Sequence, residues 1–423
     1  MNFLRNMKRR PWYYLVISAA SFLMVMICLG FCSSTKSLYL NAITDALQIK
    51  RSLFSFNDSA RFVTTAVVNL FFGTLVLKFG PRKLIAAGFV ALCCSMMVYS
   101  LADNIYVFYL GGVLLGVGMS WTTTTMVGYV INHWCKEHKG TIMGAVMASN
   151  GLGGAIAAQV ISPFIESSAF GYRIAYRLTA VILLIVGMIV VGLFKDTPEG
   201  VTLQAKGEKK AKGEGWSGIS LQECLRKPWF YVALVCVFLT GLTLQGSSGV
   251  YPAHMKDVGI DPAYVATVVS VHSLCLTLFK FLTGFSYDRF GLRATMLICD
   301  GAALVMIFLL ANIQAGDNVS AMVVGSISSL ALPLETIMLP LITAELVGNK
   351  DFARIMGLIV SINVAGYAVG APLVNLFYDV QHTYKYILLV LLGVMALITI
   401  VFQLCLTAAH KTRRQIQLAE TAE

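Results

Sequence analysis

Apolar runs of about 20 residues, separated by short polar segments, recur along the whole chain of 423 residues. A helix needs a run of this length to cross about 30 Å of hydrocarbon at roughly 1.5 Å per residue. The pattern therefore predicts an all-α membrane protein with twelve transmembrane helices. They are expected at residues 12–38, 58–77, 83–102, 105–132, 140–164, 174–194, 228–252, 263–286, 294–312, 319–346, 353–377 and 384–407.

A short motif occurs twice, half a chain apart. The first copy reads Gly73-Thr-Leu-Val-Leu-Lys-Phe-Gly80-Pro-Arg82-Lys83, and the second reads Gly284-Phe-Ser-Tyr-Asp288-Arg289-Phe-Gly291-Leu-Arg293. The repeat predicts two six-helix halves, residues 1–194 and 228–410, joined by a linker at 195–227 and followed by a tail at 411–423. Membrane proteins built from duplicated halves are typically carriers, with the substrate site near the bilayer midplane.

The linker is the one long polar stretch, rich in lysine and glycine. Its charge and glycine content indicate a solvated cytoplasmic segment. Near its end, Ser220 followed three residues later by Glu223 predicts a short capped helix.

The charge distribution sets the orientation. Hydrophobic residues make up 57% of the chain and charged residues only 13%, while the net charge is +11. If both termini are cytoplasmic, most lysines and arginines fall on the inner side, so the positive-inside bias explains the charge without a nucleic-acid partner. We expect a multi-pass protein of the cell (plasma or inner) membrane, in contact with the lipid bilayer and functional as a monomer. The outer segments then carry only Lys50, Arg51, Arg61, Arg173, Arg177, Lys256 and Lys385.

Several function classes lack sequence support. No GxxxxGK[ST] phosphate loop, HExxH or GxSxG motif occurs, so neither an ATP-driven pump nor a membrane hydrolase is indicated. The ten cysteines include no CxxC pair, and we interpret them as packing residues with free thiols. We expect no enzyme activity, no metal and no cofactor.

The two motif copies resemble the loops between spans 2 and 3 and between spans 8 and 9 of the major facilitator superfamily, and the resemblance covers the whole chain. It implies two six-helix halves related by a pseudo-twofold axis. In these loops Gly73, Gly80, Gly284 and Gly291 would allow tight turns. Arg82, Lys83, Arg289 and Arg293 would meet carboxylates or helix C-termini and, with Asp288, latch one conformational state. The first copy has Leu77 in place of the usual acid.

Finer features are similar to the branch of monocarboxylate transporters and oxalate–formate antiporters. The similar segments are Asn132-His-Trp134-Cys-Lys-Glu-His-Lys139-Gly140, and Glu345-Leu-Val-Gly348 with Gly357, Gly366, Gly370, Pro372 and Tyr378-Asp379. The branch implies a carboxylate substrate.

Two lysines lie within apolar spans. Lys280 precedes Asp288 by eight residues, which places it about 12 Å deep, where a cation requires a cavity, a partner or an anion. Its position matches the branch's span-8 arginine, which holds the substrate carboxylate; a structural ion pair is the alternative. Lys36 resembles the span-1 lysine of monocarboxylate transporters and would attract or gate the anion near the outer boundary, unless it only snorkels to the interface.

Other polar residues in the spans are further candidates. Glu335 lies between Pro333 and Pro340, so its helix is expected to break, and the carboxyl could carry a proton or pair with Lys280. The branch's span-8 aspartate is replaced by Leu276, and Glu335 or His272 could substitute for it. Asn69, Asn363 and Tyr367 would either line the substrate cavity or bond across helices.

These features predict a secondary active transporter that moves a small organic anion, a monocarboxylate, by alternating access, as proton symport or anion exchange. Two alternatives remain open. The first is a carrier of a zwitterion such as an amino acid, with Glu335 and Lys280 holding opposite charges. The second is a non-transporting membrane receptor, for which the short linker and tails offer no sensory domain.

Overall fold

The computed structural model describes residues 13–49, 51–135, 137–166, 168, 170–195 and 219–422, and the regular secondary structure within these ranges is helical. The chain divides into two compact units, Met1–Lys210 and Ala211–Glu423. The division falls within the predicted linker, of which residues 196–218 lie outside the described residues. The exact domain boundaries therefore stay a prediction.

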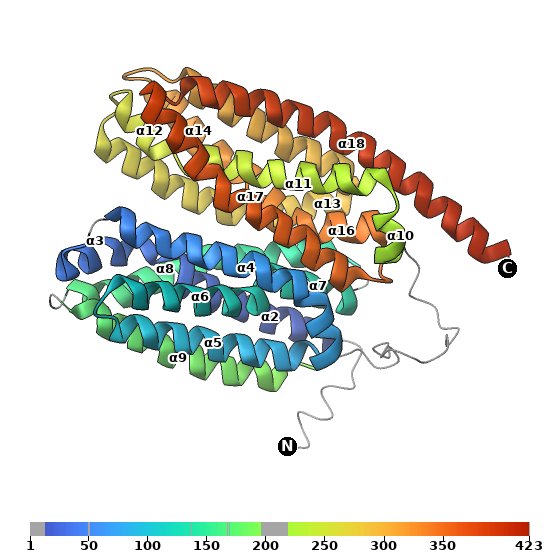
Figure 1. Cartoon of the computed structure of the whole chain (residues 1–423), viewed down its shortest axis with the longest axis horizontal. Helices are drawn as coiled ribbons and strands as arrows, with labels where there is room; N and C mark the ends of the chain where they lie inside the picture. The colour runs from blue at the N-terminus through green and yellow to red at the C-terminus, as the bar shows by residue number, and fades with distance from the viewer. Residues whose placement is uncertain are drawn as a thin grey trace. The chain divides into compact units, whose positions relative to one another are not determined.

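In the first unit, α4 and α5 pack on α6, α5 also packs on α9, and α2 packs on α8. Figure 1 shows these helices, coloured blue to green, lying lengthwise beside one another. Their bounds are α2 (Tyr13–Leu29), η1 (Gly30–Ser34), α3 (Lys36–Leu47), α4 (Arg51–Phe79), α5 (Pro81–Leu101), α6 (Ile105–Thr122), α7 (Thr124–Trp134), α8 (Lys139–Glu166) and α9 (Gly171–Leu193).

In the second unit, α11 packs on α17 and α18, while α13 packs on α14 and α18. These helices are yellow-green to red in Figure 1. Their bounds are α10 (Leu221–Leu225), α11 (Pro228–Ser248), α12 (Tyr251–Asp257), α13 (Pro262–Asn312), α14 (Asn318–Ala331), α15 (Pro333–Thr336), α16 (Met338–Val347), α17 (Phe352–Gln381) and α18 (Lys385–Ala422). The predicted last span ends at 407, but α18 continues through most of the predicted tail.

Within the described residues, 11 helical stretches are long and apolar enough to cross a membrane. One of them, Thr267–Asn312, contains Gly291 at φ 78° and ψ 176°, which interrupts the helix. Such a positive φ favours glycine, because a side chain would clash with the backbone. The stretch therefore makes two crossings, and the predicted all-α fold with twelve spans is confirmed.

The outer surfaces of the helices are apolar. Leu274 and Val319 are 75% and 76% exposed, and many other large aliphatic and aromatic side chains are more than a third exposed. Exposed apolar area on this scale marks a surface that contacts something other than water. Together with the length of the apolar helices, it indicates a multi-pass protein whose outer faces meet lipid.

Two predicted spans are not continuous helices. The first, expected over 12–38, changes to the π-helix η1, turns at Thr35 and restarts as α3 at Lys36. The tenth, expected over 319–346, is divided into α14, α15 and α16 around Pro333 and Pro340, as those prolines predict. Both interruptions lie beside buried polar side chains.

The end of the linker is held by the predicted cap. The Ser220 hydroxyl accepts a hydrogen bond from the Glu223 backbone N–H at 3.3 Å, and the Ser220 backbone N–H donates to Glu223 Oε2 at 2.7 Å. This capping box starts α10. The pKa of Glu223 is lowered from its usual value, first by the bond from the Ser220 hydroxyl and then by the bond from its backbone N–H.

Candidate functional site

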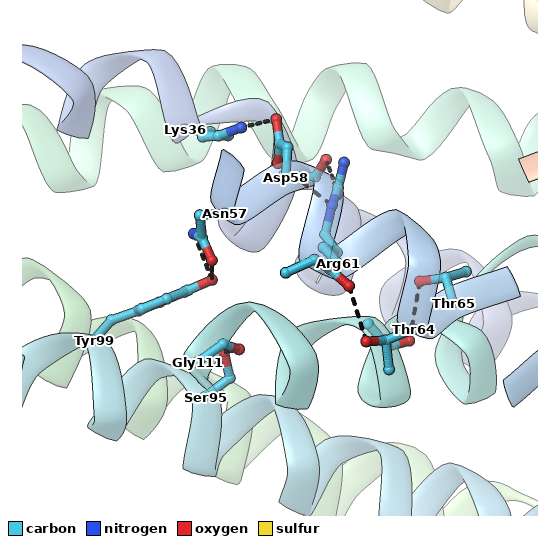
Figure 2. A network of polar contacts seen from close by, with 12 residues as sticks. Lys36, Asn57, Asp58, Arg61, Thr64, Thr65, Ser95, Tyr99 and Gly111 are labelled. Carbon is cyan, nitrogen blue, oxygen red and sulfur yellow. Dashed lines mark hydrogen bonds and ion pairs between the residues drawn. The ribbon is translucent and has the colours of Figure 1, made fainter. Parts of the chain in front are cut away.

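Each half holds its own polar cluster between helices, and the first is centred on Asp58 of α4. Asp58 forms an ion pair with Lys36, the first residue of α3, and its Oδ1 lies 3.5 Å from Nε of Arg61. The Lys36 and Asp58 side chains are 30% and 32% exposed, whereas that of Arg61 is 13% exposed. Figure 2 shows the three charged groups gathered where α3 meets α4.

The irregular end of the first span positions this cluster. The guanidinium of Arg61 donates to the hydroxyl of Ser33, a residue of η1, at 3.0 Å. The π-helix lies against α8 so closely that a Cβ on Gly30 would come within 2.4 Å of the backbone of Gly153. Single π-turns inside α-helices are frequent at functional sites, because they redirect the side chains that follow. Ser33 and Ser34 lie in this π-helix, and Lys36 follows it as the first residue of α3.

Neutral polar and aromatic groups surround the charges. Asn57 and Tyr99 exchange hydrogen bonds of 2.9 and 3.2 Å (Figure 2), and Ser34 donates to Asn150 Oδ1 at 2.9 Å. Tyr39 stacks on Tyr176, with ring centroids 4.1 Å apart. This environment of rigid aromatic rings and amide groups limits the positions that the charged side chains can adopt.

The cluster carries two cations and one carboxylate, so an additional anion would be attracted to it. The sequence pattern predicts a role for Lys36 but places Arg61 in the outer segments and indicates no role for Asp58. That assignment of Arg61 is wrong, since the side chain is largely buried within the helix bundle. Asp58 and Arg61 could have been recognised from the sequence as a pair of opposite charges three residues apart at the predicted start of a span, because residues three apart share one helix face.

The second cluster, in the C-terminal half, is centred on Glu335 in the short helix α15. Glu335 is 4% exposed; its Oε2 accepts a hydrogen bond from Gln245 of α11 at 2.9 Å. The Tyr367 hydroxyl of α17 lies 3.4 Å from the Glu335 carbonyl oxygen. The other carboxyl oxygen, Oε1, has no hydrogen-bond partner. The structure thus brings two of the predicted residues, Glu335 and Tyr367, together at the break in the tenth span.

Lys280 is buried in α13 and is 4% exposed. Within the described part of the chain, its ammonium group forms no ion pair or hydrogen bond, and in particular none with Glu335. An isolated cation removed from water is strongly unfavourable unless an anion joins it. The predicted Lys280–Glu335 pair is therefore not formed in this structure.

The remaining polar candidates occupy separate positions. His272 of α13 directs Nδ1 toward the hydroxyls of Ser328 and Ser329 of α14, at 2.8 and 3.0 Å. Asn363 of α17 donates to a backbone carbonyl of α11 at 3.1 Å, so it bonds across helices. Asn69 of α4 is 1% exposed, and its Oδ1 has no hydrogen-bond partner.

Two of the four motif glycines predicted to form turns lie at helix ends, whereas the other two lie within helices, where the predicted turns are wrong. Gly80 and Gly291 have φ values of 80° and 78°, as the predicted turns require. Arg82 donates through Nε to the Val191 carbonyl in the last turn of α9 at 2.9 Å, and Arg293 donates to the Thr407 hydroxyl of α18 at 3.2 Å. Arg289 lies over the adjacent ring of Phe290. Gly73 lies within α4 and Gly284 and Asp288 lie within α13, while Lys83 is in the first turn of α5.

Comparisons with known proteins agree with this architecture. The family model described as "Major Facilitator Superfamily" matches residues 21–244 and 233–422. The chain is similar to the uncharacterized MFS-type transporter YcxA of Bacillus subtilis (strain 168), with 25% identity over 431 residues that cover 98% of this chain and 100% of that protein. It is also similar to monocarboxylate transporter 13 of Rattus norvegicus, with 25% identity over 73% of this chain and 70% of that protein.

Among solved structures, the chain resembles the transporter FucP in its outward conformation. The TM-score is 0.72 with 15% sequence identity, over 93% of this chain and 99% of FucP. At this identity the likeness concerns the fold alone. It agrees with the two-unit, twelve-span architecture described above.

Proposed function

Because the chain belongs to the major facilitator superfamily, we propose that it is a secondary active carrier that moves a small organic anion, a monocarboxylate, by alternating access. The superfamily consists of transporters, so a receptor without transport is disfavoured. Monocarboxylate transporter 13 is one of the relatives, and the proposal extends that chemistry to this chain. The choice of an anion depends on the charges within the spans.

The observation that carries the proposal is the isolated burial of Lys280. Lys280 is 4% exposed and has no anionic partner in the described part of the chain, so an anion from outside would balance its charge. A carboxylate that binds there replaces its hydration with a charge-assisted hydrogen bond, and it removes the unfavourable isolation of the lysine. In the N-terminal half, the two cations Lys36 and Arg61 outnumber the one carboxylate of Asp58, and this net positive charge also favours an anionic substrate.

Glu335 supports proton coupling. The Glu335 carboxyl interacts with two neutral groups, the Gln245 amide and the Tyr367 hydroxyl, and no cation among the described residues pairs with it. Intramembrane carboxyls of this kind are typical of proton pathways. Proton symport and anion exchange both remain within the proposal, with Glu335 as the proton carrier and His272 as the second candidate.

The test uses purified protein in proteoliposomes and compares Lys280→Met with Lys280→Arg. Methionine should reduce anion affinity about 10- to 150-fold, since a charge-assisted hydrogen bond contributes about 1.5–3 kcal/mol, whereas arginine should keep measurable transport. Lys256→Ala, an exposed lysine of the same half, is the matched control and should transport normally.

Thermal unfolding of the same variants separates binding from structure. Without substrate, Lys280→Met should be at least as stable as the parent, because it removes an unpaired buried charge. A strong loss of stability would indicate a structural ion pair, and normal anion transport by Lys280→Met would overturn the proposal. Competition by neutral amino acids but not by lactate or oxalate would favour the zwitterion alternative.

The oligomeric state of the carrier, its membrane and its orientation in that membrane complete the proposal. We propose that it acts as a monomer in the plasma or inner membrane, with both termini and residues 195–227 in the cytoplasm. The distribution of lysine and arginine along the chain supports this orientation.

A further inference from the structure

A second buried carboxyl in the C-terminal half plays no part in the proposed substrate site. Asp300 lies in α13 beyond the interruption at Gly291, within the predicted ninth span, and is 3% exposed. It borders a small cavity of about 20 Å³. The lining is otherwise mostly apolar and includes Met296, Ile342 and Phe402, with Thr240 and Asn363 as its other polar members.

The oxygen atoms around this cavity are all acceptors. Asp300 Oδ2 and Asn363 Oδ1 are buried and have no hydrogen-bond partner. One N–H of the Asn363 amide group donates to a carbonyl of α11 at 3.1 Å. The hydroxyls of Thr240 and of Thr399, which interacts with the Asp300 carboxyl, donate to carbonyls of their own helices at 2.8 and 2.9 Å. With its hydroxyl hydrogen directed to its own helix, Thr240 offers a lone pair to the cavity, while the second N–H of the Asn363 amide remains a donor.

Two unpaired buried acceptors, Asp300 Oδ2 and Asn363 Oδ1, are unfavourable, since each loses its hydration without replacement, and an ionised carboxyl beside apolar groups adds the cost of a buried charge. Two kinds of bound species would satisfy these oxygen atoms: hydrogen-bond donors or a metal cation. The cavity volume matches one water molecule, which needs about 10–15 Å³ and two to four polar partners. Most of the lining is apolar, so a metal ion would have few oxygen ligands. A water molecule needs only the acceptors that are present.

We propose that Asp300 binds a proton and that one water molecule fills the cavity between Asp300, Asn363 and Thr240. The protonated Oδ2 donates to the water oxygen, and the two water protons go to Asn363 Oδ1 and the Thr240 hydroxyl oxygen. Asp300 Oδ2 and Asn363 Oδ1 are then both paired, and no net charge remains beside the apolar lining. This proton site is distinct from Glu335, whose carboxyl bonds to Gln245 and does not border the cavity.

The charged surroundings of Asp300 are sparse. Among the described residues that line the cavity, Asp300 is the only titratable one. Two cations of α13, Lys280 and Arg293, lie 20 and seven residues from Asp300 along the chain, and Arg293 donates to Thr407. The titratable groups next in sequence to residues that line the cavity are Cys299, Cys236 of α11 and Glu335 of α15, and Cys405 of α18 lies three residues from Phe402. None of the latter groups is a cation that could stabilise an ionised Asp300.

Infrared spectroscopy tests the proposal directly. In wild-type protein at neutral pH, the C=O stretching band of a protonated carboxyl should be present and should shift when aspartate is labelled with ¹³C at its side-chain carboxyl. The band should disappear in Asp300→Asn and persist in the matched control Glu335→Gln. If the labelled wild-type protein shows only ionised aspartate bands, the proposal is overturned, whether or not the Asp300 variant folds.

Thermal unfolding provides the second measurement. Asp300→Asn resembles the protonated side chain, so it should unfold at or above the wild-type temperature, and its advantage should grow as the pH rises and the wild type must release the proton. A stabilisation of wild type by sodium over potassium that vanishes in Asp300→Asn would show a metal site and refute the proton. Neither measurement depends on the identity of the transported substrate.

Discussion

Replacing Asp58 with asparagine should destabilise the N-terminal half by about 2–3 kcal/mol, because it leaves Lys36 and Arg61 as neighbouring like charges. At 3.5 Å and an effective dielectric constant of about 20, the attraction between Arg61 and Asp58 is about 5 kcal/mol. Asp58 is 32% exposed, so water screens part of this attraction. Breaking a fully buried pair costs about 3–5 kcal/mol and an exposed pair about 0–1 kcal/mol. The expected loss lies between these limits.

Asp103→Asn is the matched control, because it removes a single ion pair in the same half. Asp103 contacts Arg173 at 2.6 Å but is 78% exposed, so its loss should cost no more than about 1 kcal/mol. The assay is thermal unfolding of purified protein, in which 1 kcal/mol corresponds to about 2–4 °C for a unit of 150–250 residues. Asp58→Asn should therefore lower the midpoint by about 4–12 °C, and Asp103→Asn by less than about 4 °C.

The double variant Lys36→Met/Asp58→Asn tests the cause of the loss. Because methionine removes one of the two like charges, the double variant should recover part of the stability that Asp58→Asn loses. Equal shifts in Asp58→Asn and Asp103→Asn would show that burial of the cluster has no energetic consequence. A double variant less stable than Asp58→Asn would refute the role of repulsion between Lys36 and Arg61.

Two further predictions concern packing and pH. A Cβ on Gly153 would lie 1.9 Å from the Met26 carbonyl oxygen, so Gly153→Ala should lower the free energy of unfolding by about 1–3 kcal/mol. A Cβ on Gly393 would have nothing within 4 Å, so Gly393→Ala should raise that free energy by up to about 1 kcal/mol. Equal effects of the two variants in thermal unfolding would contradict the close approach of α2 and α8. The capping box at Ser220 should persist above pH 4.5, the usual pKa of Glu223, and be lost as the pH falls through its lowered folded value. Amide hydrogen exchange of Leu221–Leu225 should therefore accelerate in acid for the wild type, whereas in Glu223→Gln it should show no such acid step.

Features set by local chemistry could be predicted from the sequence. The break around Glu335 follows from proline, which removes a helical hydrogen bond wherever it occurs. The turn at Gly291 follows from a conformation that favours glycine, and the cap of α10 follows from Ser220 and Glu223, three residues apart. The length of the apolar runs was sufficient to predict the number of transmembrane spans.

Features that depend on which helices pack together could not be predicted. The Asp58–Lys36 ion pair joins two helices, and the π-helix that orients Lys36 depends on the contact between Gly30 and Gly153. The separation of Lys280 from Glu335 likewise depends on the packing of α13 against α15. Asp300 is a different case: it lies inside a predicted span, and a search for acidic residues in the spans would have found it.

The cations of the N-terminal half have an anionic partner and the buried Lys280 of the C-terminal half has none among the described residues, and this difference affects how a carrier binds an anion. In the N-terminal half, Asp58 already neutralises one of its two cations, so that cluster is tolerable without substrate. In the C-terminal half, Lys280 has no such partner among the described residues. A ligand stabilises a protein only through interactions that the empty protein lacks. The free energy that an anion contributes should therefore be larger at Lys280 than at Lys36 and Arg61, whose charges Asp58 already shares.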